Sequence, residues 1–253
     1  MDAHLDAAWL FCVFLIATRL AGLLFLTPVL GFSTVPPVIR VIFVLVLAYC
    51  LAAVPEVHAV DVPDNLVSLG VVTVSEFGIG ALIGGIMRAA IASFGFAGQL
   101  IDFQVGFSAA ALFDPLTSIQ SSVISTLLET FAAVAFLALD MHHVLLRGFA
   151  MLFVDLPPGI VGGSMDMSAL FTAMGLVFFY GLAIAVPVVL GLMLVDVAIA
   201  VTSRSMPQIN IYFVALPFKV FFGLGLLALS FVHVGPLAQS VFERAIGSIA
   251  QVH

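Results

Sequence analysis

The chain alternates between long apolar stretches and short polar breaks. Hydropathy marks six apolar blocks, at Leu5–Leu30, Val38–Val54, Leu66–Ile101, Val123–Phe153, Met167–Val201 and Ile209–Val234. A straight membrane-spanning helix needs about 20 apolar residues. The second block has only 17 residues, whereas the third, fourth and fifth have 36, 31 and 35. The pattern therefore predicts an all-α integral membrane protein made of bent and broken helical hairpins, with about six apolar segments.

Ionisable residues lie inside these apolar blocks. They are Arg19, Glu76, Arg88, Glu129, Asp140, Arg147, Asp196 and Lys219. Each costs about 2.5–3.5 kcal/mol at the centre of a membrane helix on insertion scales. Pro187 and Pro217 interrupt the last two blocks and should kink or break the helices there. We therefore expect bent helices that pack mostly against protein rather than against lipid.

Composition supports the same class of protein. Of 253 residues, 63% are apolar and only 8% are charged, against about 25% charged in soluble domains. These values exclude a soluble enzyme and a disordered chain. The net charge is −7 and there is no basic patch, so nucleic acid is a poor partner. Cys12 and Cys50 lie in apolar runs without a CxxC pair, and we interpret both as buried small hydrophobic residues. Residues 1–253 then form a single membrane domain.

The sequence contains no recognised catalytic, cofactor-binding or metal-binding motif. The GxSxG, Walker A, HExxH and dinucleotide-binding patterns are all absent. Asp140, His142 and His143 could suggest a metal site. Adjacent histidines on a helix point about 100° apart, however, and do not easily share one ion. We expect no enzymatic activity, no cofactor and no metal.

A ladder of small residues runs along the third block. It recurs every four residues at Ala81, Gly85, Ala89, Ser93 and Ala97. Such rows let two helix backbones approach closely. Packing within the chain and packing between subunits both fit this spacing. The length of the ladder, five residues, slightly favours subunit packing.

A polar stripe is predicted on the fourth block. At about 100° per residue, Glu129, Asp140 and Arg147 fall within about 20° of one helix face, and His143 lies near it. Three interpretations remain open: charge pairs that lock neighbouring helices, a water-lined or subunit-facing helix, and a proton relay. The relay is the least favoured because a single helix supplies the stripe.

The segment Gly95–Ser122 mixes glycine, glutamine, phenylalanine and small polar residues, and it holds no lysine or arginine. Irregular backbone at membrane depth is tolerated only where it lines a cavity or is buried in protein. The segment is therefore a candidate pore loop or plug, although a partly buried connector fits equally well. The candidate pore residues are Gly106, Phe107, Ser108, Leu112, Phe113, Asp114 and Pro115.

Four motifs carry a resemblance to a known family in matching order and spacing. They are Arg19 with the following Thr27-Pro28 and Val35-Pro36, the segment Gly98–Pro115, the turn Leu156–Gly159, and the segment Met206–Pro217 with Pro207, Gln208, Asn210 and Pro217. Together they resemble the FliR family, the export-gate subunits of the bacterial flagellar type III secretion apparatus. The counterpart in the injectisome is the T subunit (SctT).

The resemblance implies a structural and gating subunit of a protein export channel. Its implied partners are FliP-like and FliQ-like subunits, with a FlhB-like subunit associated, and its cargo is unfolded export substrate. Residues 1–165 would be FliP-like and residues 166–253 a FliQ-like helical hairpin. The implied location is the bacterial inner membrane at the flagellar basal body, in contact with lipid, and the family's plug loop would fall at about Gly106–Ser122.

The chain departs from the family pattern at Asp102 and Val105, where Gly and Met are common, and at Met206 and Ala215, where Ala and Gly are common. Asp102 places an extra carboxylate beside the pore loop. The alternative functions are the injectisome counterpart of the same gate and a secondary transporter with broken helices. No related halves are visible, which disfavours the transporter.

Overall fold

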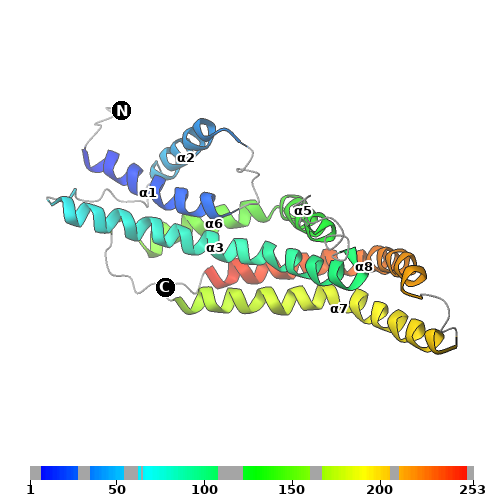
Figure 1. Ribbon diagram of the computed structural model, residues 1–253. Helices are drawn as coiled ribbons and strands as arrows, with labels where there is room; N and C mark the ends of the chain where they lie inside the picture. Colours follow the sequence, from blue (N-terminus) through cyan, green and yellow to red (C-terminus); the bar gives the residue numbers. More distant parts are fainter. Residues whose placement is uncertain are drawn as a thin grey trace. The chain divides into compact units, whose positions relative to one another are not determined.

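The computed structural model describes residues 7–27, 35–53, 62–63, 65–107, 122–159, 167–205 and 211–249. These residues form helices joined by turns, without a strand among them. The helices are α1 (Ala7–Leu26), α2 (Pro37–Ala52), α3 (Leu66–Val105), α5 (Val123–Ala138), α6 (Met141–Asp155), α7 (Met167–Ser205) and α8 (Ile211–Ile249), as labelled in Figure 1. The predicted all-α fold class is confirmed.

The starts of α2 and α3 follow from local sequence. Pro37 occupies the first position of α2, where its missing N–H and fixed φ are tolerated. Before α3, the side-chain oxygen of Asn65 accepts a hydrogen bond of 3.2 Å from the Val67 amide. This is the bond of an N-terminal cap, which satisfies one of the free amides at a helix start.

Helix lengths reproduce the irregular block lengths. Helices α1, α3, α7 and α8 are long and apolar enough to cross a membrane, and α5 with α6 forms a further candidate span that is bent by 68°. The break lies at Asp140, a non-glycine residue with a φ of 55°. Helix α2 has only 16 residues. The chain therefore carries four candidate membrane spans, or five with the bent pair, among the described residues.

Of the kink or break predicted at Pro187 and Pro217, the break does not occur, because α7 continues through Pro187 and α8 continues through Pro217. A proline removes one backbone hydrogen bond, while an apolar environment penalises every additional unpaired group that a break would expose. The prediction that both cysteines are buried is wrong for Cys50. Cys12 is buried, but Cys50 is exposed, because α2 exposes most of its side chains.

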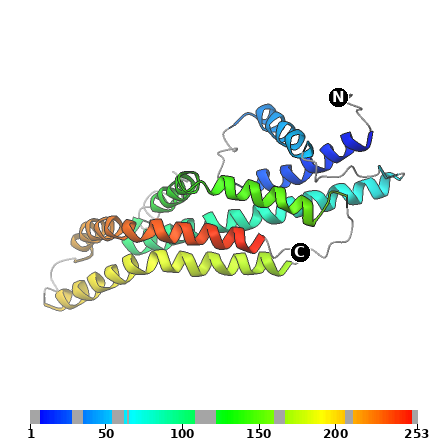
Figure 2. The ribbon, with the colours of Figure 1, turned by 180° about the vertical axis from the view of Figure 1, so that it is seen from behind.

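The described chain divides into two compact units. Unit 1 comprises residues 1–89, 136–174 and 242–253, and unit 2 comprises residues 90–135 and 175–241. In unit 1, α1 lies along the first part of α3 (Figure 1). In unit 2, α7 and α8 lie side by side in both views (Figures 1 and 2), and Gly191 of α7 faces Leu226 of α8.

Candidate functional site

The start of α5 is tied to the end of α3 within unit 2. The Asp102 carboxylate accepts a hydrogen bond of 3.2 Å from the Ile124 amide and another from the Ser122 hydroxyl. The Ser122 oxygen in turn accepts a bond of 3.0 Å from the Ser125 amide. Two of the free amides of α5 are thus satisfied, one by its own cap residue and one by a residue of another helix. We call this arrangement the neck, defined by Asp102, Ser122 and Ile124.

Glycines of α3 bring α5 close enough for this contact. The Ser125 hydroxyl donates a bond of 2.9 Å to the Gly95 carbonyl. A Cβ atom at Gly98 would collide with the backbone of Ser125. These contacts require a flat surface on α3, which only glycine provides. Both glycines lie at the start of the predicted pore segment, but no local pattern in the sequence indicates their contact with α5.

A second polar contact anchors the end of α3. The Gln104 amide donates a hydrogen bond of 2.9 Å to Asp196 of α7. The other oxygen of Asp196 lies 2.7 Å from the ammonium group of Lys219 on α8. Three helices of unit 2 therefore meet at one carboxylate. The pairing also accounts for two of the charges that lie inside apolar blocks.

Only the first two candidate pore residues are described. Gly106 follows α3 with a φ of +96°, and its amide donates a bond of 3.1 Å to the Asp102 carbonyl. A left-handed glycine is a common helix terminator because it has no Cβ penalty there. Phe107 is half-buried. The remaining pore residues, Ser108, Leu112, Phe113, Asp114 and Pro115, lie outside the described residues, so the pore assignment stays a prediction.

Unit 1 contains a buried ion pair. The Arg19 Nε atom lies 2.6 Å from Glu76 Oε2, and both side chains are 1% exposed. Arg19 also donates to the Leu156 carbonyl at 3.0 Å, and Glu76 accepts from the Gly159 amide at 2.8 Å. The Arg19 guanidinium lies over the Phe153 ring, 4.6 Å from its centroid. The pair thereby joins α1 and α3 to the turn after α6.

The small-residue ladder lies on both buried and partly buried surface of α3. Ser93 and Ala97 are buried within the chain, whereas Ala81, Gly85 and Ala89 are half-buried. A neighbouring row on α3, with Gly80 and Gly84, packs against the backbone of α1 within unit 1. A Cβ atom at Gly84 would lie 2.6 Å from the Leu23 carbonyl oxygen of α1, and one at Gly80 would collide with Arg19 backbone. Subunit packing through the ladder stays a prediction.

The polar stripe does not lie on one continuous helix. Glu129 belongs to α5, Asp140 lies at the break, and His143 and Arg147 belong to α6. A common face requires an unbroken helix between residues 129 and 147, and the left-handed conformation of Asp140 ends α5 before that point. The angular reasoning behind the stripe is therefore wrong. Glu129 and Arg147 are exposed.

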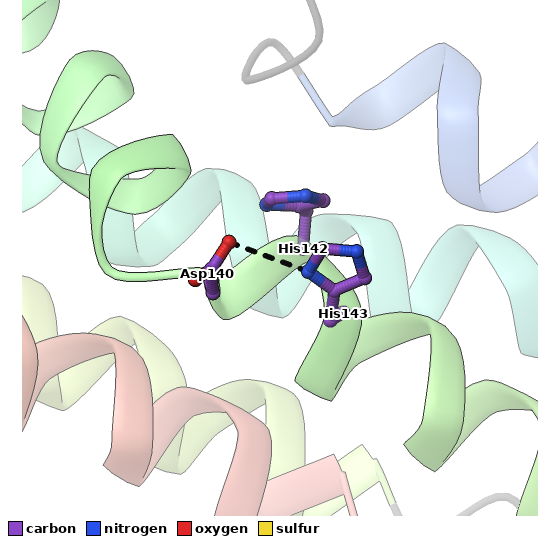
Figure 3. Close-up of side chains that lie close together, drawn as sticks. All are labelled: Asp140, His142 and His143. Atoms are coloured by element: carbon purple, nitrogen blue, oxygen red, sulfur yellow. Dashed lines mark ion pairs between the residues drawn. The ribbon is translucent and has the colours of Figure 1, made fainter.

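The break instead gathers Asp140, His142 and His143, drawn in Figure 3. Their possible ligand atoms all lie within 4.8 Å of one another. Asp140 Oδ1 lies 3.4 Å from His143 Nδ1, and the two histidine rings lie 4.0 Å apart. Nδ1 of His142 is buried without a hydrogen-bond partner among the described residues. A bound zinc ion would hold its ligand atoms about 3.3 Å apart, closer than the 4.8 Å limit of this group. Because Asp140 and His143 are 76% and 65% exposed, we assign no metal here.

The family turn motif is only partly described. Pro207, Gln208 and Asn210 lie outside the described residues. Pro217 is exposed within α8. Its position two residues before Lys219 places it close in sequence to the Asp196 contact.

Long apolar helices with paired internal charges define a helical membrane protein that spans the bilayer several times. Comparison with known proteins then gives the family. The chain belongs to the bacterial export proteins, family 1, whose pattern matches residues 10–245. The resemblance to FliR drawn from the sequence motifs is thereby confirmed.

Curated relatives cover nearly the whole chain. The flagellar biosynthetic protein FliR of Bacillus subtilis (strain 168) is 29% identical over 237 residues, which are 92% of this chain and 90% of the relative. FliR of Caulobacter vibrioides is 29% identical over 231 residues, 91% of this chain and 92% of the relative. FliR of Escherichia coli (strain K12) is 26% identical over 249 residues, which are 97% of this chain and 94% of the relative.

Proposed function

We propose that this protein is a structural and gating subunit of the flagellar type III protein export channel in the bacterial inner membrane. It assembles with FliP-like and FliQ-like subunits, with a FlhB-like subunit associated, and passes unfolded proteins. The observation that carries the proposal is the family match over residues 10–245, together with full-length relatives named for flagellar biosynthesis. An export subunit of this kind is a structural component, not an enzyme.

Exposed apolar surface supports an assembled protein. Helix α2 is too short for a simple crossing, yet its outward side chains are large and apolar. They include Val38, Ile39, Val41, Ile42, Phe43, Leu45, Val46 and Tyr49. A continuous surface of this kind marks contact with protein or lipid. In a gate that rises from the membrane, neighbouring subunits cover such surface.

The neck supports a plug in the segment Gly106–Ser122. Both ends of this segment are held by polar contacts within unit 2, through Asp102 at Ser122 and through Gln104 at Asp196. A plug must be retained at its base while its central part moves aside. The FliP-like part at residues 1–165 and the FliQ-like hairpin at residues 166–253 complete the proposed organisation.

The transporter alternative is weaker. It relied on helices broken at Pro187 and Pro217, and both helices continue through these residues. The injectisome counterpart is disfavoured by relatives that are named flagellar.

Co-purification tests the proposal. A tagged copy of the chain, produced together with FliP-like, FliQ-like and FlhB-like subunits, is extracted in mild detergent and analysed by mass spectrometry and electron microscopy. We expect FliP-like and FliQ-like subunits in fixed ratios to this chain. Purification as a free monomer, together with full swimming motility after deletion of the gene, would refute the assignment.

A further inference from the structure

We propose that Arg88 of α3 binds a carboxylate on a membrane helix of a neighbouring subunit. Arg88 is exposed in the interior of a 40-residue apolar helix. It takes part in none of the hydrogen bonds or ion pairs observed among the described residues. An unpaired arginine at such a position is costly in hydrocarbon. The inference rests on the proposed function, because it gives the chemistry of one contact in the proposed assembly.

No carboxylate of α3 itself reaches Arg88. The acids of this helix are Glu76 and Asp102, which lie about 18 and 21 Å from Arg88 along the axis at 1.5 Å per residue. Both oxygens of Glu76 are also occupied, one by Arg19 and the other by the Gly159 amide. Since no described residue pairs with Arg88, its counter-charge is expected from another molecule.

The surface of α3 that leads to Arg88 is apolar and becomes flat towards the arginine. At about 100° per residue, six positions fall within about 100° of one another on the helix surface. They are Val71, Val74, Gly78, Ala81, Gly85 and Arg88. The two valines are 48% and 71% exposed, and the three small residues are half-buried. Arg88 is the only charge among these positions.

Small residues favour a protein helix over lipid as the neighbour of Arg88. Helix α3 is about 60 Å long against about 30 Å of hydrocarbon, so its length permits either a lipid phosphate or a protein carboxylate there. Gly85 and Ala89 flank Arg88 within one turn. Small residues of this kind let a second helix approach closely. A helix packed there removes the guanidinium from water, and a buried arginine needs a carboxylate as its partner.

A carboxylate opposite Arg88 makes the contact selective. An arginine binds a carboxylate through two parallel hydrogen bonds of fixed geometry, which sets the register of the partner helix. An apolar helix without an acid at that position would leave the arginine buried and unpaired, which costs more than the pair contributes. Arg88 therefore distinguishes between helices that fit the flat surface equally well.

Four variants test the contact in the complex with co-produced subunits. R88E reverses the charge, R88Q removes it, and R88K keeps the charge without the two-bond geometry. R204E is the matched control, because Arg204 is exposed in the last turn of α7. Recovery of partner subunits is quantified by mass spectrometry. Thermal unfolding of the isolated chain in detergent is measured for each variant.

We expect R88E to lower partner recovery by about tenfold or more, since two negative charges would meet at the contact. R88Q should lower recovery less, R88K should keep most of it, and R204E should stay within about twofold of the wild type. The unfolding temperature should stay unchanged in all four variants, because both arginines are exposed in the isolated chain.

A charge swap identifies the partner. Each Asp or Glu in an apolar segment of the recovered subunits is replaced by Arg in the R88E background, and one of these swaps should restore recovery. If R88E lowers the unfolding temperature of the isolated chain, R88Q combined with Gln at each of the same acids decides instead. Restoration by one double variant supports the inference in either background.

Two results would overturn the inference. The first is normal recovery with R88E and R88Q. The second is a loss that no double variant restores, and a response of that loss to added anionic lipid would assign a lipid phosphate to Arg88. Recovery of no subunit by the wild type would refute the proposed function and this inference together. Recovery of partners that the Arg88 variants leave unchanged would refute the inference alone.

Discussion

At the scale of single residues, charge in an apolar chain is tolerated where it finds a partner. Arg19 and Glu76 are almost fully buried and satisfy each other as well as two backbone groups of the turn after α6. Removal of one partner from such a pair leaves an unpaired buried charge, which costs far more than the pair contributes. The pair therefore fixes how α1, α3 and this turn fit together.

E76Q tests this pair with little change in volume. Because Arg19 loses its counter-charge while staying buried, we expect the free energy of unfolding to fall by about 3–5 kcal/mol. Thermal unfolding of the purified chain in detergent is the measurement. The double variant R19M/E76M should lose less than the single variant, since no charge remains buried.

R88Q is the matched control, because Arg88 also lies on α3 but is exposed. Its effect should stay within about 0.5 kcal/mol. Equal losses for E76Q and R88Q would mean that the buried pair has no special role in stability.

Contacts between residues far apart in the sequence could not be predicted from local patterns. Arg19 and Glu76 could be marked as costly from composition, but their pairing spans 57 positions, and no local pattern encodes it. Asp102 was marked as an extra carboxylate, yet its partner Ser122 lies across a loop of irregular sequence. Local rules predicted helices correctly, because backbone groups in an apolar chain must bond within the helix. Pairings between helices depend on the whole fold.

At the scale of helices, glycine decides how closely two elements approach. Gly80 and Gly84 lie against the backbone of α1, whereas the predicted ladder at Gly85 and Ala89 is half-buried. The two rows adjoin on α3 and differ in what covers them. Periodicity revealed the ladder but did not show that the adjoining row, with Gly80 and Gly84, makes the contact within the chain. The break at Asp140 was missed for a related reason, since no glycine or proline marks it.

Substitutions in the two rows should therefore have different effects. G84A pushes a methyl group to 2.6 Å from the Leu23 carbonyl oxygen, and we expect a loss of about 1–3 kcal/mol in stability through forced separation of α1 and α3. G85L and A89L should leave the unfolding temperature of the isolated chain nearly unchanged but reduce recovery of partner subunits. Pull-down yield and thermal unfolding are measured on the same preparations. Normal partner recovery with G85L and A89L would remove the ladder from the subunit interface.

At the scale of the whole molecule, the described helices expose many large apolar side chains. Large apolar side chains are exposed on α2, α7 and α8 alike. In the assembly proposed above, neighbouring subunits and lipid would cover this surface.

The plug makes one prediction at this scale. Phe113→Ala should raise the resting conductance of reconstituted complexes, because a filling side chain is lost from the proposed plug, and removal of several residues between Gly106 and Ser122 should raise it more. Both variants should assemble normally, since the loop would face the export path. A shortened loop that assembles and stays as tight as the wild type would mean that another subunit closes the channel.

The exposed face of α2 makes the last prediction. Ile42 is 54% exposed, and in the assembled gate we expect it to be covered by apolar surface. I42K would place a charge there at a cost of about 2.5 kcal/mol or more. Since about 1.4 kcal/mol corresponds to a tenfold change in an equilibrium constant, partner recovery should fall by more than tenfold. S205K adds the same charge at the exposed end of α7, beside Arg204, and should leave recovery within about twofold of the wild type.

Partner subunits are quantified relative to this chain by mass spectrometry after mild extraction. Full recovery with I42K would show that the outward face of α2 stays in contact with water or lipid headgroups, and the subunit interface would then have to lie on α7 and α8.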